Sequence, residues 1–251
     1  MFPIRLSLAT YNLWNTERWP EREPALQFFT DRYKPDILCL QELRSETRTM
    51  LDQALPNHDR VNDDFPGWIC EGNIYWRSDL FSCIEYGAED IGILSDYRRL
   101  FWIRLKQNDG DKVFFVSTAH YTYQCHPKER ETGNSPRLEE TRETVTALRR
   151  LVTDDEPVFF MGDLNDSIHP LRILYDAGYK NCFSELGVVS PPTFPSMPTA
   201  GPVTGIPRIT ATIDWLFANE KARPIAAQVP HCYHENLTPS DHWPVLAVYE
   251  I

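Results

Sequence analysis

Two short stretches of the sequence decide how this chain folds: Val158-Phe-Phe-Met-Gly-Asp-Leu-Asn-Asp166 and Ser240-Asp-His-Trp-Pro-Val245. In the first, an apolar run is short enough to be a buried strand, and Asp163 and Asn165 follow it. In the second, an Asp-His pair precedes an apolar strand that closes the chain. Because ligand sites in α/β sheets gather at strand ends, both stretches predict a polar site at the edge of a sheet.

Polar residues also stand at the ends of the other predicted strands. They are Asn12 in TYNLW, Glu42 in LCLQE, His120 in VSTAH, Asp214 in TIDWLF, and Asp241 with His242 in SDHWPV. Each of them alone has an ordinary explanation, because Asn or Asp at a strand end is more often a turn or capping residue than a ligand. The evidence for a site lies in the combination.

Hydrophobic periodicity and turn residues divide the rest of the chain into alternating elements. We expect strands at 4–12, 37–41, 68–76, 79–86, 98–106, 112–119, 158–162, 210–217 and 243–249, and helices at 21–33 and 137–152. Residues 121–136 are expected to be irregular, and the proline-rich residues 191–207 to form a long surface loop. Many strands with helices between them predict two packed sheets with outer helices, here as one domain over 1–251.

The order of the strand-end residues resembles the endonuclease/exonuclease/phosphatase superfamily. The resemblance runs from Thr10 to Pro244 and is carried by GDLND and SDHWPV, with an Ile-Asp-Trp-Leu-Phe strand between them. It implies an α/β fold, a four-layer α-β-β-α sandwich of two mixed, mostly antiparallel sheets with outer helices. It also implies hydrolysis of a phosphate ester with Mg²⁺ or Mn²⁺, by in-line attack of a water.

The resemblance and the chemistry of phosphate esters together imply a role for each residue. Mg²⁺ takes hard oxygen ligands, so Glu42 is the candidate principal ligand, with Asn12 and Asp241 beside it. Asp163 would orient or deprotonate the attacking water, and Asn165 would hold the same water or a phosphate oxygen. The remaining residues are Asp214 and His242, which would form a carboxylate–imidazole dyad, and His120, which would donate to a second phosphate oxygen. The general base and the number of metal ions stay open.

Three further residues are weaker candidates for contact with substrate. Glu71, in EGNIYWR, is placed where some relatives have an acidic residue that supports the histidine of the site, and the alternative is a surface carboxylate. Arg137 opens a helix where relatives often carry an arginine, and the alternative is a salt bridge to nearby glutamates. Trp14 could stack on a base or sugar, or pack in the core.

Composition limits the function further. The 25 Lys and Arg face 36 Asp and Glu, a net charge of −11, which argues against binding nucleic acid by bulk charge. The absence of a long apolar run excludes a transmembrane helix, and the absence of a signal sequence predicts a cytoplasmic protein with reduced cysteines.

We expect a monomer with no protein partner. Its substrate would be DNA or RNA, or else an inositol phosphate, a phospholipid or another small phosphate ester. The alternative from another class is an inactive binding protein with this fold.

Overall fold

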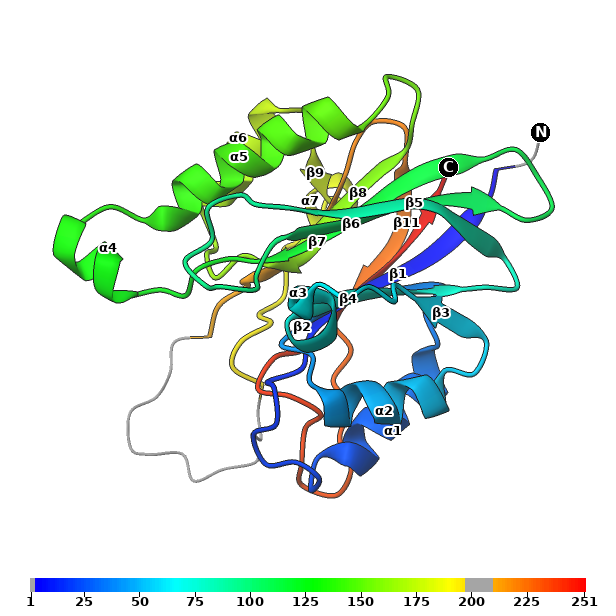
Figure 1. The fold of residues 1–251 in the computed structure, drawn as a ribbon, viewed down its shortest axis with the longest axis horizontal. Helices are drawn as coiled ribbons and strands as arrows, with labels where there is room; N and C mark the ends of the chain where they lie inside the picture. The colour runs from blue at the N-terminus through cyan, green and yellow to red at the C-terminus, as the bar shows by residue number, and fades with distance from the viewer. Residues whose placement is uncertain (1–2, 197–209) are drawn as a thin grey trace.

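A computed structural model describes residues 3–196 and 210–251 (Figure 1). The described chain contains two six-stranded sheets. The first has the spatial order β11 (Arg223–Gln228), β12 (Val245–Glu250), β1 (Arg5–Asn12), β2 (Ile37–Gln41), β4 (Gly72–Arg77), β3 (His58–Arg60). The second has the order β5 (Phe81–Glu89), β6 (Leu100–Gln107), β7 (Val113–His120), β8 (Val158–Asp163), β10 (Asp214–Ala218), β9 (Lys180–Asn181).

Both sheets are mixed and mostly antiparallel. Only β1–β2 and β7–β8 pair in parallel among the described strands, and the other neighbours are antiparallel.

The helices are α1 (Glu23–Tyr33), α2 (Ser45–Ala54), α3 (Pro66–Cys70), α4 (Pro127–Thr132), α5 (Pro136–Leu151), α6 (His169–Asp176) and α7 (Cys182–Glu185). None of the described helices is long and apolar enough to cross a bilayer.

Three apolar layers hold the sandwich together. The middle layer lies between the sheets, the second lies between the β8 sheet and α5 with α6, and the third lies between the β1 sheet and α1 with α2 (Figure 1). Alternation along β8 shows the principle, because Phe159 and Met161 join the middle layer while Val158 and Phe160 join the layer under α5. The predicted four-layer α-β-β-α sandwich is confirmed.

Some sequence-based boundaries were wrong. Residues 66–70 form α3, not the start of a strand at 68, because Pro66 opens a helix whose Trp68 packs against Phe101. Within 121–136, residues 127–132 form α4, with Pro127 in its first turn and the side chain of His126 accepting from the Lys128 amide.

Other elements are shorter than predicted or were missed. Strand β10 begins at 214, since Ala211 makes only an isolated bridge to Phe194. Helices α2, α6 and α7 and strands β3, β9 and β11 had no clear signal in the sequence. Of the predicted loop at 191–207, residues 197–207 lie outside the described chain. All six cysteines are free, as predicted.

Candidate active site

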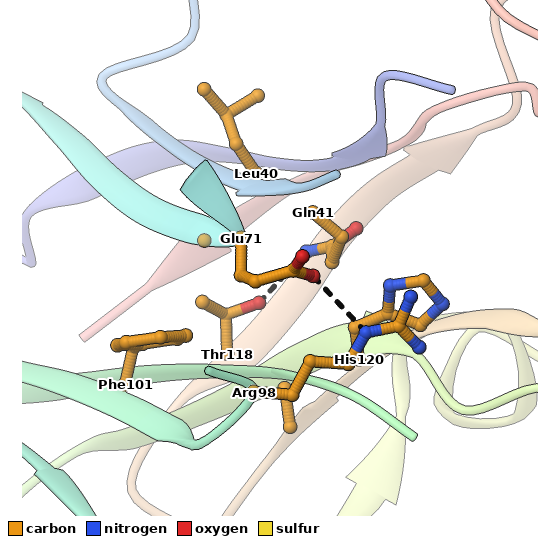
Figure 2. Close-up of a pocket in the computed structure, with 9 residues that line it drawn as sticks. Leu40, Gln41, Glu71, Arg98, Phe101, Thr118 and His120 are labelled. Atoms are coloured by element: carbon orange, nitrogen blue, oxygen red, sulfur yellow. Dashed lines mark hydrogen bonds and ion pairs between the residues drawn. The ribbon is translucent and has the colours of Figure 1, made fainter. Parts of the chain in front are cut away.

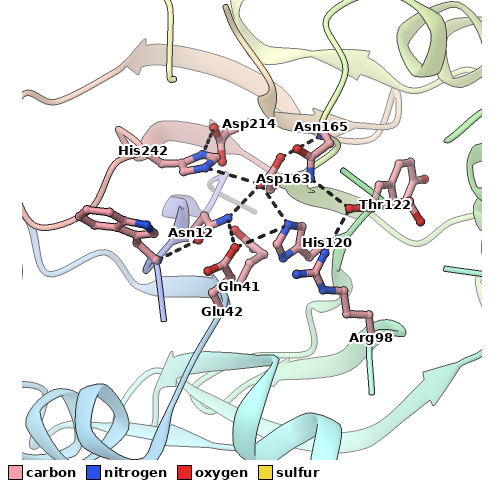
Figure 3. Close-up of polar contacts among 12 residues, drawn as sticks. Asn12, Gln41, Glu42, Arg98, His120, Thr122, Asp163, Asn165, Asp214 and His242 are labelled. Carbon is pink, nitrogen blue, oxygen red and sulfur yellow. Dashed lines mark hydrogen bonds and ion pairs between the residues drawn. The ribbon is translucent and has the colours of Figure 1, made fainter. Parts of the chain in front are cut away.

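Three neighbouring strands of the second sheet bring three site residues side by side. The parallel pairing of β7 with β8 sets His120 opposite Asp163, and the antiparallel pairing of β10 with β8 sets Asp214 opposite Asp163 on the other side. All three are buried. Residues far apart in the sequence thus become lateral neighbours at one edge of the sheet (Figure 3).

Gly162 makes this close alignment possible. Its φ is +151°, and a Cβ at this position would lie 2.0 Å from the carbonyl oxygen of Ala119 in β7. Any other residue would push β7 and β8 apart just before His120 and Asp163. The glycine of the GDLND motif is therefore a requirement of strand packing.

The first sheet contributes Asn12, at the end of β1, and Glu42, just after β2. The Asn12 Nδ2 donates to Asp163 Oδ2 at 2.9 Å and to Glu42 Oε1 at 3.3 Å. The Asn12 Oδ1 accepts from the backbone N–H of Trp14 at 2.9 Å. Asn12 therefore connects the two sheets, and its amide nitrogen is the group that faces the carboxylates.

His242 and Asp214 form the predicted dyad. The imidazole Nδ1 lies 2.8 Å from Asp214 Oδ2, so the other ring nitrogen, Nε2, faces Asp163 Oδ2 at 3.8 Å and Asp241 Oδ1 at 3.9 Å. Burial opposes protonation of His242, but the charges of Asp214 and Asp163 outweigh it and raise its pKa to about 10. The ring of Phe194 packs on the imidazole with centroids 4.8 Å apart.

Asp163 is the central acceptor of the site. Burial and the charge of Asp214 raise the pKa of Asp163, while the His242 charge and the Asn12 and Asn165 hydrogen bonds oppose that rise. Asn165 has a left-handed φ of 49°, its amide N–H donates to Asp163 Oδ1 at 2.8 Å, and its Nδ2 donates to the carbonyl of Tyr121 at 3.0 Å. The turn after β8 is thereby fixed against the end of β7.

His120 is held in a different state from His242. Its Nε2 lies 3.3 Å from Asp163 Oδ2 and 4.0 Å from Glu42 Oε1, whereas its Nδ1 has no hydrogen-bond partner among the described residues. Burial, followed by the charge of Arg98, holds the pKa of His120 well below its usual value. Behind the ring is a cavity of about 10 Å³, near the size of a single water, which Glu71 and Arg98 also line (Figure 2).

The residues around Glu42 fit a hard divalent cation. Glu42 has a left-handed φ of 53°, and its side chain is 18% exposed, so it is accessible at the rim. Its Oε2 accepts from Asn15 Nδ2 at 3.0 Å, so the carboxylate is fixed from two sides. Asp241 follows Ser240, whose hydroxyl donates to the Asn12 carbonyl at 2.6 Å. Carboxylate oxygens are donors that Mg²⁺ and Mn²⁺ prefer. The Asn12 amide turns its NH₂ to Glu42 and its oxygen to the Trp14 N–H, so in this orientation it supports the Glu42 carboxylate and offers the cation no oxygen, unlike the ligand role predicted from the sequence.

A second group of side chains is also close enough to hold a metal ion. Candidate ligand atoms of Asp163, Asp214 and His242 all lie within 4.8 Å of one another. A cation there would compete with the Asp214–His242 hydrogen bond and would need a neutral imidazole. Coordination by the Glu42 carboxylate requires no neutral imidazole.

The weaker candidates lie around the site. Glu71 pairs with Arg44 at 3.4 Å and with Arg98 at 3.1 Å, so two arginines hold its carboxylate beside the His120 cavity. Arg98 carried no signal in the sequence, because a single arginine at the start of the strand expected at 98–106 is typical of a surface residue. Trp14 is half-buried, with Arg22 at 5.1 Å over its ring.

Arg137 is buried at 4% exposure. Its guanidinium pairs with Glu129 at 2.6 Å and with Asp166 at 3.3 Å, and it donates to the Thr122 carbonyl at 3.1 Å. These contacts favour the salt-bridge alternative over contact with substrate.

Residues 9–242 match the model of the Endonuclease/Exonuclease/phosphatase family. The chain belongs to this family. Its members are hydrolases that act on phosphate esters. The resemblance predicted from the strand-end motifs is confirmed, and the endonuclease/exonuclease/phosphatase fold accounts for both sheets and the outer helices.

Solved structures of the same fold are distant in sequence. An endonuclease/exonuclease/phosphatase family protein from Bacteroides thetaiotaomicron has a TM-score of 0.78 at 19% identity, over 99% of this chain and 98% of that one. The mannosyl-6-phosphatase of Bacteroides thetaiotaomicron VPI-5482 has 0.77 at 19%, over 98% and 99%. TDP2 of D. rerio, complexed with single-strand DNA product, has 0.76 at 17%, over 98% of both chains. No curated protein sequence matches this chain.

Proposed function

We propose that this endonuclease/exonuclease/phosphatase family protein is a Mg²⁺- or Mn²⁺-dependent phosphodiesterase that acts on nucleic acid. The observation that carries the proposal is the arrangement about Asp163, whose Oδ2 accepts from Asn12 and lies 3.3 Å from His120 and 3.8 Å from His242. A carboxylate surrounded by an amide and two imidazoles can orient a water while the imidazoles bind phosphate oxygens.

His242 is suited to donate to the phosphate as negative charge develops. Asp214 fixes the imidazole through Nδ1, so the proton on Nε2 is directed toward the space between Asp163 and Asp241.

Asp163 is the acceptor that would take the proton of the attacking water, with Asn12 and Asn165 fixing its two oxygens. Glu42, together with Asp241, would hold the divalent cation, and the Asn12 amide would hold the Glu42 carboxylate in place. When bound, the cation would neutralise charge on the phosphate and the leaving oxygen.

Support for a nucleic-acid substrate comes from the relative TDP2, whose structure contains single-strand DNA product. The mannosyl-6-phosphatase supports the second candidate, a small phosphate monoester. The net charge of −11 favours a substrate that binds mainly within the site, because acidic residues outnumber basic ones and repel phosphates elsewhere on the surface.

A substrate panel tests the proposal. Purified protein is assayed with single- and double-stranded DNA, RNA, mannose 6-phosphate, inositol phosphates and sphingomyelin, each with Mg²⁺, Mn²⁺ or EDTA. We expect metal-dependent cleavage of an oligonucleotide that Asp163→Asn reduces by at least about 10²-fold. Cleavage of a monoester alone would establish the second candidate. Cleavage that is equal in EDTA, or absent from every arm, would overturn the proposal.

A further inference from the structure

Arg22, the residue that precedes α1, is a buried cation held by carbonyl oxygens. Its side chain is fully buried. Its five N–H donors are matched by five backbone carbonyls: those of Glu17 at 2.6 Å, Leu13 at 3.2 Å, Trp14 and Asn15 at 3.3 Å each, and Pro239 in a short contact. An arginine has no more donors than these.

No carboxylate lies within ion-pair distance of Arg22 among residues 3–196 and 210–251. The guanidinium instead has Trp14 at 5.1 Å and Trp19 at 5.8 Å from the ring centroids. A buried charge is costly unless its hydrogen bonds are complete, and aromatic faces add further stabilisation. An apolar residue could fill this space without the cost of burying a charge, so the presence of an arginine here suggests that its hydrogen bonds have a purpose.

Four of the five carbonyls bound by Arg22 belong to a loop of unfavourable backbone conformation. Trp14, Asn15 and Arg18 have left-handed φ values of 55°, 38° and 54°. Each such residue other than glycine costs roughly 1 kcal/mol or more. Four of the five hydrogen bonds of Arg22 fall within 13–17, so the guanidinium offsets this cost and selects one conformation of the loop.

Both segments joined by Arg22 reach the candidate metal site. In the loop, Asn15 Nδ2 donates to Glu42 Oε2 at 3.0 Å. On the other side, Pro239 precedes Ser240, whose hydroxyl donates to the Asn12 carbonyl at 2.6 Å and accepts from the His242 amide at 3.1 Å. A single guanidinium thus fixes the two segments that carry Asn15 and Asp241 relative to each other.

We propose that Arg22 is a positioning residue for divalent-cation binding, which acts by presenting Asn15 to Glu42 and by fixing the turn that carries Asp241. The inference rests on the proposed function, since it assumes a cation at Glu42. Arg22 itself bonds only to backbone carbonyls and is not a ligand. Its effect passes through the geometry of residues 13–17 and 239–241.

Charge and geometry act in opposite directions here. Removal of the positive charge of Arg22 near Glu42 would strengthen the binding of a cation. Loss of the hydrogen bonds from the guanidinium to the loop carbonyls would weaken that binding, because Asn15 would no longer be held against Glu42. Arg22→Lys keeps the charge and loses the planar five-donor geometry. This variant therefore isolates the effect that we propose.

The test measures Mn²⁺ binding directly, by electron paramagnetic resonance of free Mn²⁺, on the full chain. We expect Arg22→Lys and Asn15→Ala each to raise the Mn²⁺ dissociation constant about tenfold. The turnover number at saturating Mn²⁺ should stay within about threefold of wild type. In the double variant, Arg22→Lys should add little to Asn15→Ala, because both remove the same link. Arg18→Lys, in the same loop but paired with the exposed Glu21, is the matched control and should bind Mn²⁺ like wild type.

The outcomes separate this inference from the proposed function. If wild type binds no Mn²⁺, or if Glu42→Gln binds as wild type does, the proposed cation site fails. If wild type binds and Arg22→Lys binds equally well, or if the two single effects add in full, only the inference is overturned. Should Arg22→Lys not fold, Asn15→Ala decides the matter, and an unchanged dissociation constant overturns it. A loss of thermal stability with unchanged Mn²⁺ affinity would show a merely structural role.

Discussion

The Nδ2 of Asn12 donates to Oδ2 of Asp163 across 2.9 Å, and this hydrogen bond connects the first sheet to the second at the candidate active site. The two residues are 151 positions apart. Both are buried at the ends of strands β1 and β8. The two halves of the candidate site therefore depend on the stacking of the sheets, and small shifts between the sheets would separate Asp163 from Asn12 and Glu42.

The first prediction concerns this link. Asn12→Ala should lower activity by about 10- to 100-fold, since a supporting hydrogen bond of this kind is lost. Its unfolding free energy should fall by about 2 kcal/mol, because a buried carboxylate loses a donor. Asn12→Asp is the companion variant, in which a further carboxylate repels Glu42 and Asp163. It should be less stable than Asn12→Ala in EDTA and regain part of that loss with Mg²⁺. Equal activity of wild type and Asn12→Ala would contradict the role.

The second prediction concerns pH. Carboxylate neighbours raise the pKa of His242 to about 10 against burial, above the roughly 6.5 of an unfolded histidine. The folded state therefore binds the proton more tightly, and this stabilisation is complete below about pH 6.5 and lost as the pH rises toward 10. Urea unfolding in EDTA measures this effect. Between about pH 6.5 and pH 10, the unfolding free energy of wild type should fall by on the order of a few kcal/mol more than that of His242→Asn.

Asp214→Asn serves as the control for that measurement. It removes the carboxylate that most raises the His242 pKa, so its own stability should also depend less on alkaline pH. Parallel curves for wild type and both variants would show that the Asp214–His242 pair carries no linked proton.

The third prediction concerns Gly162. Gly162→Ala places a Cβ 2.0 Å from the Ala119 carbonyl, so β7 and β8 must separate. We expect a loss of about 3 kcal/mol or more of unfolding free energy, together with activity, because His120 and Asp163 move apart. Gly187→Ala is the matched control, since Gly187 also has a positive φ, of 69°, but has open space around its Cβ position. It should cost only about 1 kcal/mol. Equal losses would mean that the backbone angle, and not the contact with β7, matters at Gly162.

The fourth prediction separates the two roles considered for Arg137. Arg137→Met leaves the half-buried Glu129 without its arginine and the buried Asp166 with only His169 as an ion-pair partner among the described residues. The unfolding free energy should fall by about 3 kcal/mol, while KM for the cleaved substrate stays within about twofold. A raised KM with unchanged stability, measured by urea unfolding and steady-state kinetics, would instead place Arg137 against substrate.

Sequence alone determined the strands that carry the site. The apolar run 158–161 and its following carboxylate marked β8 and Asp163, because a short buried strand has a continuous apolar signal. Likewise the polar ends of the runs at 4–12 and 37–41 marked Asn12 and Glu42. The motifs were specific enough to predict the family and the four layers.

The tertiary structure decided which of these residues meet, and in what state. Strand pairing places His120 and Asp214 on either side of Asp163, and register cannot be read from one strand at a time. Protonation is equally a matter of surroundings, since His242 faces carboxylates while His120 lies in a buried site near Arg98. Arg22 is the clearest example of a residue whose environment the sequence does not predict. In the sequence it is one of several arginines in a polar stretch, and only folding brings carbonyls from residues 13–17 and 239 to its five donors.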